Sequence, residues 1–369
     1  MRRHRIPRAI IAVLAAWNAV AASGMAAATP ISVPPLLPGQ VLRLAPVAGT
    51  GTATADYGIG ATDLCEFMEF PSGTLQVCGD SFAGQGVGYG GWYSPIALHV
   101  VDESLDQGEV RYDRVTGVFE PLLTDPTPPG ASQLPAGVVE INRDNYLMVT
   151  TTEALRPQSS RLVHAVAGQT NWATIPGSVR DADHAGGAQS QISGYYDPIP
   201  AVDSARGWVY IVANNFDRSG PVSLYRATPG EFTDRSSWQA WTGTGWGGEA
   251  APLWADRVGE FSVRQIDGAT VLSYFNATTG NMEIRVARDP TLLGSAPVTT
   301  VVVAAPWPDR AEVLPPPQDN RLAQPYGGYL SPRSTLDDVR VFVSQWNTTP
   351  RGGTPYRVIQ YAVNPFKPW

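Results

Sequence analysis

The sequence predicts an all-β protein, specifically a five-bladed β-propeller whose ring is closed by an N-terminal strand. The 369 residues include 37 glycines and 33 prolines, about a fifth of the chain. These residues separate short runs in which apolar and polar side chains alternate, the pattern of strands joined by turns. The runs recur in groups of four, and serial four-stranded groups are typical of propellers.

Five groups of strands are expected in chain order. Their predicted strands are residues 60–67, 74–79, 94–101 and 109–113; 137–141, 146–152, 161–167 and 172–175; 195–201, 208–213, 222–227 and 238–241; 261–265, 270–275, 282–287 and 298–303; and 328–332, 340–345 and 356–362. The last group has only three strands, so we expect residues 40–46 to supply the fourth. The alternative is a two-sheet sandwich followed by a second β domain, but no clear linker divides residues 40–369.

The first 27 residues have the pattern of a signal peptide. Arg2, Arg3, Arg5 and Arg8 precede an apolar run over residues 10–22, and small residues follow at 25–28. The apolar run is too short for a comfortable membrane span of ~20 residues, which disfavours an uncleaved anchor. We therefore expect a secreted or cell-envelope protein, with residues 28–39 as a proline-rich extended leader.

The charge of the chain restricts its partners. The formal net charge is −7, and losing the four arginines of the signal peptide makes it −11. An acidic surface disfavours nucleic acid and anionic lipid, so we expect neither nucleic acid nor a membrane as partner after cleavage, and a monomer.

The segment 63–82 is expected to form a hairpin that brings pairs of like residues together. Its turn is 70–73, with Pro71 presetting φ. If paired positions sum to 143, the only two cysteines, Cys65 and Cys78, lie opposite each other, and Asp63 lies opposite Asp80. Since residues i and i+2 share a face of a strand, a disulfide and a carboxylate pair then occupy the same face.

A second register is open to this hairpin. A bulged Pro-Ser-Gly turn would shift the pairing by one residue and place the two cysteines on opposite faces. Two cysteines in an exported chain favour a disulfide, and therefore the first register.

Asp63 and Asp80 are the candidate catalytic residues. If opposed, their Cβ atoms lie about 4.5–5.5 Å apart. Two carboxylates so close do not both ionise readily, which raises one pKa and supplies one acid and one base, as glycosidic hydrolysis requires. The alternative is a pair of solvated loop aspartates or one bonded to backbone groups.

Two other chemistries find less support. Ser81, in Gly79-Asp80-Ser81, resembles the first block of GDS-type esterases, with Asp181 and His184 as an Asp-x-x-His pair, but a glycine-rich loop follows the serine where that fold needs a helix. His99, His164 and His184 are not at ligand spacing, so no metal site and no cofactor are expected.

Several residues near strand starts could bind a sugar chain, because aromatic rings cover the apolar faces of sugars while polar groups fix their orientation. The alternative for each aromatic residue is packing between blades, and for Arg218 a solvent-exposed hairpin tip. The expected substrate-binding residues are Trp92, Gln191, Arg218, Glu260, Tyr274, Tyr326 and Trp346.

Motifs spread over about residues 55–365 resemble a known family. They are Thr62-Asp63-Leu64, Gly79-Asp80-Ser81-Phe82, Gly91-Trp92-Tyr93-Ser94-Pro95, Gly207-Trp-Val-Tyr, Leu224-Tyr-Arg-Ala, Gly259-Glu-Phe-Ser-Val, Tyr326-Gly-Gly-Tyr and Val343-Ser-Gln-Trp-Asn. In this order they resemble domain of unknown function 4185 of actinobacteria, which looks to be the same group as glycoside hydrolase family 183. Ser81 stands where the family more often has threonine.

The resemblance implies a five-bladed propeller and an endo-acting D-arabinofuranase. Its substrate would be the D-arabinan of mycobacterial cell-wall arabinogalactan and lipoarabinomannan. It also implies an aspartate pair as acid and base, at Asp63 and Asp80, and favours inversion, although directly opposed strand residues suit the ~5–5.5 Å separation of retaining enzymes. A catalytically silent propeller that binds glycan is the alternative function.

Overall fold

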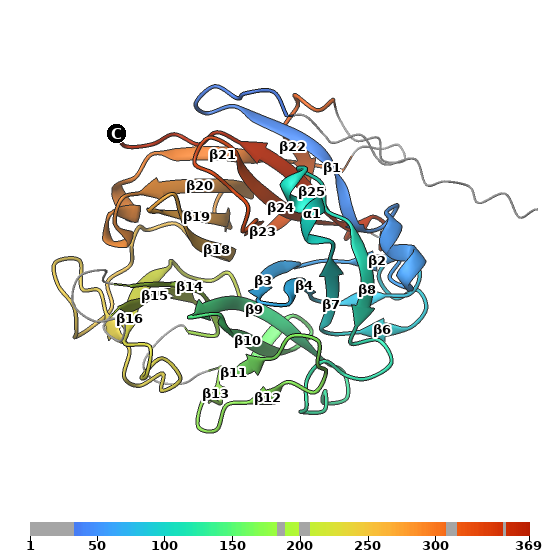
Figure 1. Ribbon diagram of the computed structural model, residues 1–369, viewed down its shortest axis with the longest axis horizontal. Coiled ribbons are helices and arrows are strands. Elements are labelled where there is room, and N and C mark those ends of the chain that lie inside the picture. The colour runs from blue at the N-terminus through green and yellow to red at the C-terminus, as the bar shows by residue number, and fades with distance from the viewer. Residues whose placement is uncertain (1–32, 183–188, 199–206, 308–315, 350–351) are drawn as a thin grey trace, which may run out of the picture.

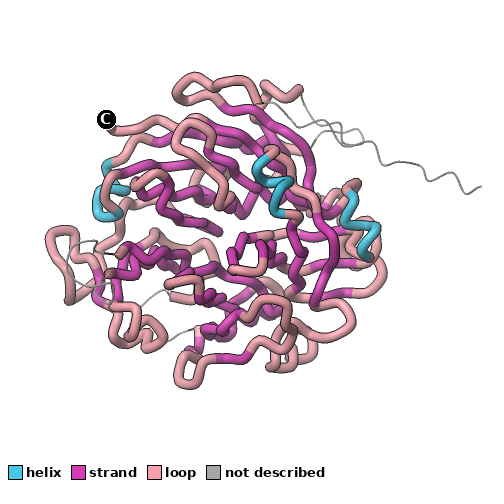
Figure 2. The backbone as a smooth tube through the Cα atoms, in the orientation of Figure 1, coloured by secondary structure: helices cyan, strands magenta, loops and turns pink. Residues whose placement is uncertain are grey.

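The computed structural model describes residues 33–182, 189–198, 207–307, 316–349 and 352–369. Strands and loops make up almost all of this part (Figure 2). The helices are short: η1 (Ala53–Tyr57), α1 (Asp102–Asp106) and η2 (Pro290–Ser295). The expected signal peptide and the first residues of the leader lie outside the described residues.

The N-terminal half of the described chain, apart from β1, forms two groups of antiparallel strands. In the first group the sheet order is β3 (Glu66–Phe70), β4 (Gly73–Cys78), β7 (Ile96–Val100) and β8 (Tyr112–Thr116). A small sheet at the base of the same hairpin contains β2 (Ala61–Thr62), β5 (Ser81–Phe82) and β6 (Trp92–Tyr93). The second group contains β9 (Ala131–Ile141), β10 (Asp144–Glu153), β11 (Arg156–Ala165), β12 (Ala173–Thr174) and β13 (Arg180–Asp181).

Three further groups complete the fold. The third contains β14 (Gln191–Asp197), β15 (Trp208–Asn214), β16 (Ser223–Ala227) and β17 (Gln239–Ala240). The fourth contains β18 (Val258–Ile266), β19 (Ala269–Asn276), β20 (Asn281–Ala287), β21 (Val298–Ala305) and β22 (Arg321–Ala323). The fifth contains β23 (Pro325–Leu330), β24 (Val339–Trp346), β25 (Tyr356–Val363) and β1 (Val41–Gly49).

The first strand of each group lies at the centre of the molecule (Figure 1). There β3 contacts β9, β9 contacts β14, β14 contacts β18, β18 contacts β23, and β23 contacts β3. In the fifth group β1 pairs with β25 in antiparallel fashion, so strands from the two ends of the described chain share one sheet.

Hydrophobic side chains fill the spaces between neighbouring groups. Met68 and Val77 of the first group pack with Val138 and Leu147 of the second. The other interfaces follow the same rule, because each strand alternates its side chains between the two faces of a sheet and both faces are covered. The core is therefore divided into layers between the groups.

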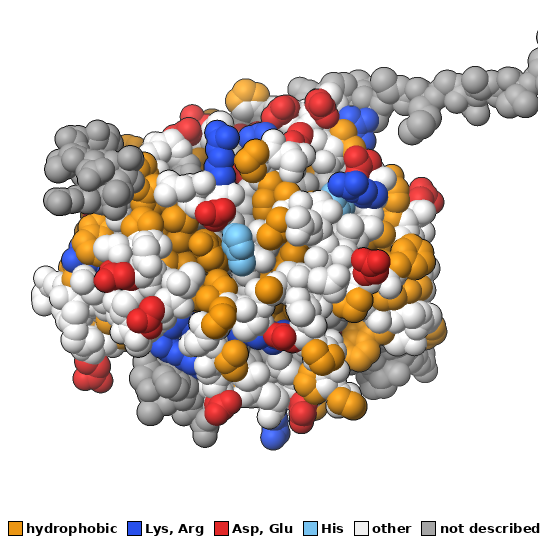
Figure 3. All heavy atoms as spheres, turned by 60° about the horizontal axis from the view of Figure 1, so that its bottom comes forward, with side chains coloured by type: hydrophobic (Ala, Val, Ile, Leu, Met, Phe, Trp, Pro, Cys, Tyr) orange, Lys and Arg blue, Asp and Glu red, His pale blue; other side chains and the backbone are white. Residues whose placement is uncertain are grey.

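Every strand predicted from the sequence overlaps a strand of the structure, while the short strands β5, β6, β13 and β22 were not predicted. No helix in the described ranges has the length and apolar character needed to cross a membrane. The face shown in Figure 3 carries acidic and basic side chains scattered among hydrophobic ones.

Candidate active site

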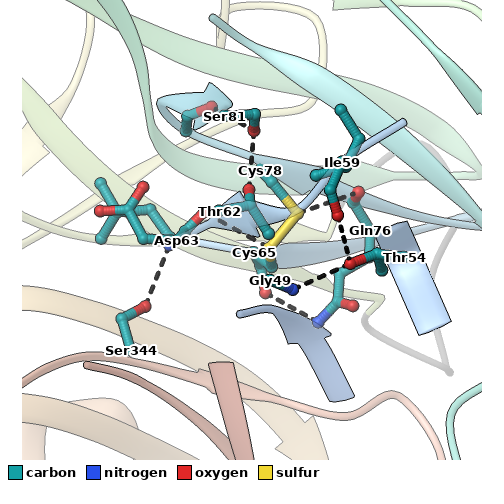
Figure 4. The surroundings of a disulfide bond; sticks show 12 residues. Gly49, Thr54, Ile59, Thr62, Asp63, Cys65, Gln76, Cys78, Ser81 and Ser344 are labelled. Carbon is teal, nitrogen blue, oxygen red and sulfur yellow. Dashed lines mark hydrogen bonds between the residues drawn. A yellow bond between two sulfur atoms is a disulfide. The ribbon is translucent and has the colours of Figure 1, made fainter. Parts of the chain in front are cut away.

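The hairpin of β3 and β4 has the register whose paired positions sum to 143. Glu66 pairs with Val77 and Phe70 with Gly73, and the same register continues in the small sheet, where Thr62 pairs with Ser81. Cys65 and Cys78 form a disulfide (Figure 4). The prediction of this register and disulfide is confirmed, and the register shifted by a bulge is wrong.

Hydrogen bonds around the disulfide fix the backbone that carries the two aspartates. The amide of Gly79 donates to the carbonyl oxygen of Asp63 over 2.8 Å, and the hydroxyl groups of Thr62 and Ser81 lie 2.7 Å apart (Figure 4). Leu64 has a φ of +48° and donates its amide to Ser344 Oγ. A leucine in this region is conformationally strained, and such strain is often found next to functional residues.

Gly79 leaves the space that the Asp63 carboxyl group occupies. A Cβ atom at this position would lie 2.7 Å from Asp63 Oδ1. Any other residue would displace the carboxyl group or the strand, so the glycine is a steric requirement of the site.

Asp63 and Asp80 line one cavity of about 550 Å³. Four of the predicted substrate-binding residues line it too: Arg218, Glu260, Tyr326 and Trp346. Apolar side chains complete the wall, among them Phe82, Leu134, Phe216 and Phe275. The cavity thus joins carboxylates, one guanidinium and aromatic surface in a single concave site, which is the usual composition of a ligand pocket.

Asp63 is 5% exposed, and only one of its carboxyl oxygens is hydrogen-bonded. Oδ2 accepts from the Tyr326 hydroxyl at 2.7 Å, whereas Oδ1 has no hydrogen-bond partner among the described residues. Burial raises the pKa of Asp63 to about 8, and the charge of Asp80 adds to this, although the hydroxyls of Tyr356 and Tyr326 act in the opposite direction. Asp63 is therefore protonated at neutral pH.

Asp80 has a different environment. Its Oδ1 accepts from Trp92 Nε1 at 3.0 Å and its Oδ2 from Ser132 Oγ at 3.2 Å. Burial raises the pKa of Asp80, while Ser94, Trp92 and Ser132 lower it by donating to the charged form. Burial raises the pKa of both carboxyl groups, and they differ in their donors, since three side chains donate to Asp80 and two to Asp63.

Glu260 and Arg218 form an ion pair in the wall of the cavity. Nε and Nη2 of Arg218 both donate to Oε1 of Glu260, at 3.0 and 2.6 Å. Glu260 is 4% exposed, and its Oε2 has no partner among the described residues. Burial alone would lower the pKa of Arg218, but the adjacent carboxylate raises it. The guanidinium also lies over the rings of Phe275 and Tyr326.

Three of the predicted substrate-binding residues, Gln191, Tyr274 and Trp92, do not line the cavity. Gln191 is buried and donates to the carbonyl of Gly259, and Tyr274 is fully buried and donates to Glu283. Neither side chain lines the cavity, because each lies on a strand face that is covered by a neighbouring strand. Trp92 is 44% exposed and positions Asp80 without lining the cavity.

The esterase alternative also fails at Ser81. The Ser81 side chain is fully buried, and its hydroxyl donates to the carbonyl of Gly79 at 3.0 Å and contacts Thr62. Its role is structural, while His184 lies outside the described residues. In the described part of the chain, no group of three or more His, Cys, Asp or Glu side chains could hold a metal ion.

Sequence reasoning missed Tyr356, Phe216 and Phe275 as cavity residues. Tyr356 starts β25 and reaches Asp63 only because the fifth group packs beside the first. The alternation of side chains along β25 could have predicted which face of the strand carries Tyr356. It could not have predicted that this face meets Asp63.

The described chain is an all-β protein in which two carboxyl groups, the buried Asp63 and the partly buried Asp80, line one cavity. The chain belongs to the family described as "Domain of unknown function (DUF4185)", whose model matches residues 48–362. A protein of Mycolicibacterium smegmatis, described as an uncharacterized 35.9 kDa protein in the asd 3' region, is 72% identical over 332 residues; the match covers 89% of this chain and all of that protein.

Several solved structures with a similar course of the chain are glycoside hydrolases. An α-L-arabinofuranosidase from Podospora anserina has a TM-score of 0.48 at 11% identity, over 88% of this chain and 98% of that one. A GH43_1 enzyme from Xanthomonas citri has a TM-score of 0.47 at 13% identity, over 87% and 90%. A Trypanosoma rangeli sialidase has a TM-score of 0.42 at 8% identity, over 82% and 54%.

Proposed function

We propose that this protein is a secreted, monomeric glycoside hydrolase that cleaves internal α-D-arabinofuranosyl linkages of mycobacterial-type arabinan, in arabinogalactan and lipoarabinomannan. The observation that carries the proposal is the pair Asp63 and Asp80 in one cavity, each with its own set of hydrogen-bond donors. The substrate follows from the family resemblance. We interpret the five strand groups as the blades of a propeller that β1 closes.

The geometry supports a division of roles. Asp63, protonated at neutral pH, donates its proton to the glycosidic oxygen as the bond to C1 breaks. Asp80, whose anion accepts hydrogen bonds from Trp92 and Ser132, takes a proton from the water that attacks C1. Asp63 ends as the carboxylate and Asp80 as the acid, and the anomeric centre is inverted.

Other groups of the cavity suit a sugar chain because they include both free donors and free acceptors. Oε2 of Glu260 and Nε1 of Trp346 are buried and have no partners among the described residues. A hydroxyl group can donate to the first and accept from the second, so a polyhydroxylated ligand satisfies both. Phe82 and Phe275 provide apolar surface for the sugar faces.

Hydrolysis of purified arabinogalactan by the mature protein tests the proposal. We expect oligosaccharide release from the wild type, and a loss of about 10²-fold or more in both Asp63→Asn and Asp80→Asn. Asp113→Asn, which changes an exposed aspartate of β8, is the matched control and should keep full activity. Proton NMR of the first product reports the anomeric outcome.

The outcomes separate the alternatives. Binding of the polymer without release of oligosaccharide would support the glycan-binding alternative instead. Release that persists in both aspartate variants would show that the catalytic residues lie elsewhere.

A further inference from the structure

A second cavity, of about 490 Å³, lies at the other end of the central strands. Along β18, Glu260 lines the first cavity and Arg264 the second. Along the fifth group, Tyr326 lines the first cavity, and Ser331, just beyond β23, lines the second. The two cavities share no lining residue, so the second is a separate site.

Two fully enclosed acceptors belong to this second cavity. Glu66 is 2% exposed and Asn145 is 0% exposed, and both line the cavity. Oε2 of Glu66 and Oδ1 of Asn145 have no hydrogen-bond partner among the described residues, while Nδ2 of Asn145 donates to the Glu69 carbonyl at 2.6 Å. A buried oxygen without a hydrogen-bond partner destabilises the folded state, so a ligand that donates to both oxygens is favoured.

The charged groups around the second cavity also favour a ligand that donates hydrogen bonds. Four acidic residues line it, against two arginines: Glu66, Glu69, Glu140, Asp267, Arg143 and Arg264. Arg264 uses Nε and Nη2 on the carbonyls of Leu330 and Phe67, at 3.0 and 2.7 Å. Burial, together with the charge of Glu69, raises the pKa of Glu140. Burial raises the pKa of Glu66 as well, so a cation that binds here takes the place of a proton on these carboxyl groups.

This set of groups differs from that of the first cavity. There the unpartnered groups include both a donor, Trp346 Nε1, and acceptors, as a sugar requires, whereas the unpartnered buried atoms of the second cavity are both oxygens, one of the Glu66 carboxyl group and one of the Asn145 amide. Tyr195 and Tyr196 add aromatic surface to its wall, which suits ammonium and alkyl groups.

We propose that the second cavity binds a small organic cation with N–H donors, such as an aliphatic diamine, independently of the function proposed for the first cavity. One ammonium group donates to Oδ1 of Asn145 and to the carboxyl group of Glu66, which releases its own proton to the solvent as the cation binds. Glu140, half-buried on β9, balances the remaining positive charge.

Calorimetric titration of the mature protein with putrescine tests this proposal, with 1,4-butanediol as the neutral ligand of equal chain length. We expect saturable binding of putrescine and at least about tenfold weaker binding of the diol. Glu66→Gln should weaken the binding of putrescine by about tenfold or more, the effect of one charge-assisted hydrogen bond. Glu140→Gln, at a half-buried position that should tolerate the change, should weaken it in the same direction.

Two control variants complete the design. Glu103→Gln changes an exposed carboxylate of α1, and Asp80→Asn changes the first cavity; both should bind putrescine like the wild type. Absence of putrescine binding, equal affinity for the diol, or unchanged affinity in both Glu66→Gln and Glu140→Gln would overturn the proposal. A loss of binding in Asp80→Asn would place the ligand in the first cavity and overturn it as well.

Discussion

The hydroxyl group of Tyr326 donates a 2.7 Å hydrogen bond to Oδ2 of Asp63, across 263 positions of the sequence. This contact joins β23 to the residue directly after β2, and it leaves Oδ1 of Asp63 as the oxygen without a partner among the described residues. The carboxyl group is thus held by one oxygen, and in the proposed function the other is the one that meets the substrate.

Tyr326→Phe should shift the pH dependence of hydrolysis. The Tyr326 hydroxyl lowers the pKa of Asp63, so its removal raises that pKa further above about 8. Because the proposed acid works in its protonated form, the alkaline limb of kcat/KM should move to higher pH. Tyr361→Phe, at a buried tyrosine outside the cavity, is the control and should leave the limb in place. An unmoved limb in Tyr326→Phe would argue against Asp63 as the acid.

Gly79→Ala should reduce activity through the position of Asp63. The added Cβ would lie 2.7 Å from Oδ1, and a displacement of about 1 Å at a catalytic group can cost about 10²-fold. Gly230→Ala is the matched control, since a Cβ there meets nothing within 4 Å. Equal rates of arabinogalactan hydrolysis in the two variants would mean that the carboxyl group moves aside without consequence.

Arg218 and Glu260 should be coupled in stability. Arg218→Met leaves the buried Glu260 carboxylate without its donor, and we expect the free energy of unfolding to fall by roughly 1–3 kcal/mol. Adding Glu260→Gln should recover part of this loss, because the uncompensated charge is gone. Urea unfolding of both single variants and the double variant gives the coupling energy, and additive losses would contradict the ion pair.

Asp63→Asn should stabilise the protein at alkaline pH. The pKa of Asp63 is about 8 in the folded state and about 3.9 in an unfolded chain, so between these values the folded state holds a proton that the unfolded state has released. The contribution of Asp63 to stability is therefore present below pH 4 and is lost as the pH rises toward 8.

The measurement is the melting temperature from pH 5 to pH 9. The advantage of Asp63→Asn over the wild type should grow up to about pH 8 and then level off, with Asp113→Asn showing no such trend. Burial also raises the pKa of Glu66 to about 8, so this second group keeps part of the pH dependence in the variant. A constant difference across the range would contradict a protonated Asp63.

Much of the first group could be predicted because its signals are local. The turn at 70–73 sets the register, and two cysteines 13 positions apart restrict it further. The same period-2 alternation located the strands of all five groups.

The alternation does not predict which individual side chains line the cavity. Gln191 and Tyr274 lie on inner strands whose two faces are both covered, so alternation does not tell which face meets the cavity. Trp92 reaches Asp80 through the pairing of β5 with β6, two short strands without a clear sequence pattern. The surroundings of these three side chains depend on how the strand groups pack against one another.

The pairing of β1 with β25 has a consequence for the order of assembly. Thr50, directly after β1, bonds to the carbonyl of Tyr356, 306 positions along the chain. A strand made at the beginning of synthesis therefore waits with an unpaired edge until the last strand has emerged. Since distant contacts form slowly, docking of β1 is expected to be a late step of folding. Tyr356 also lines the first cavity, so the wall of that cavity would be completed in the same step.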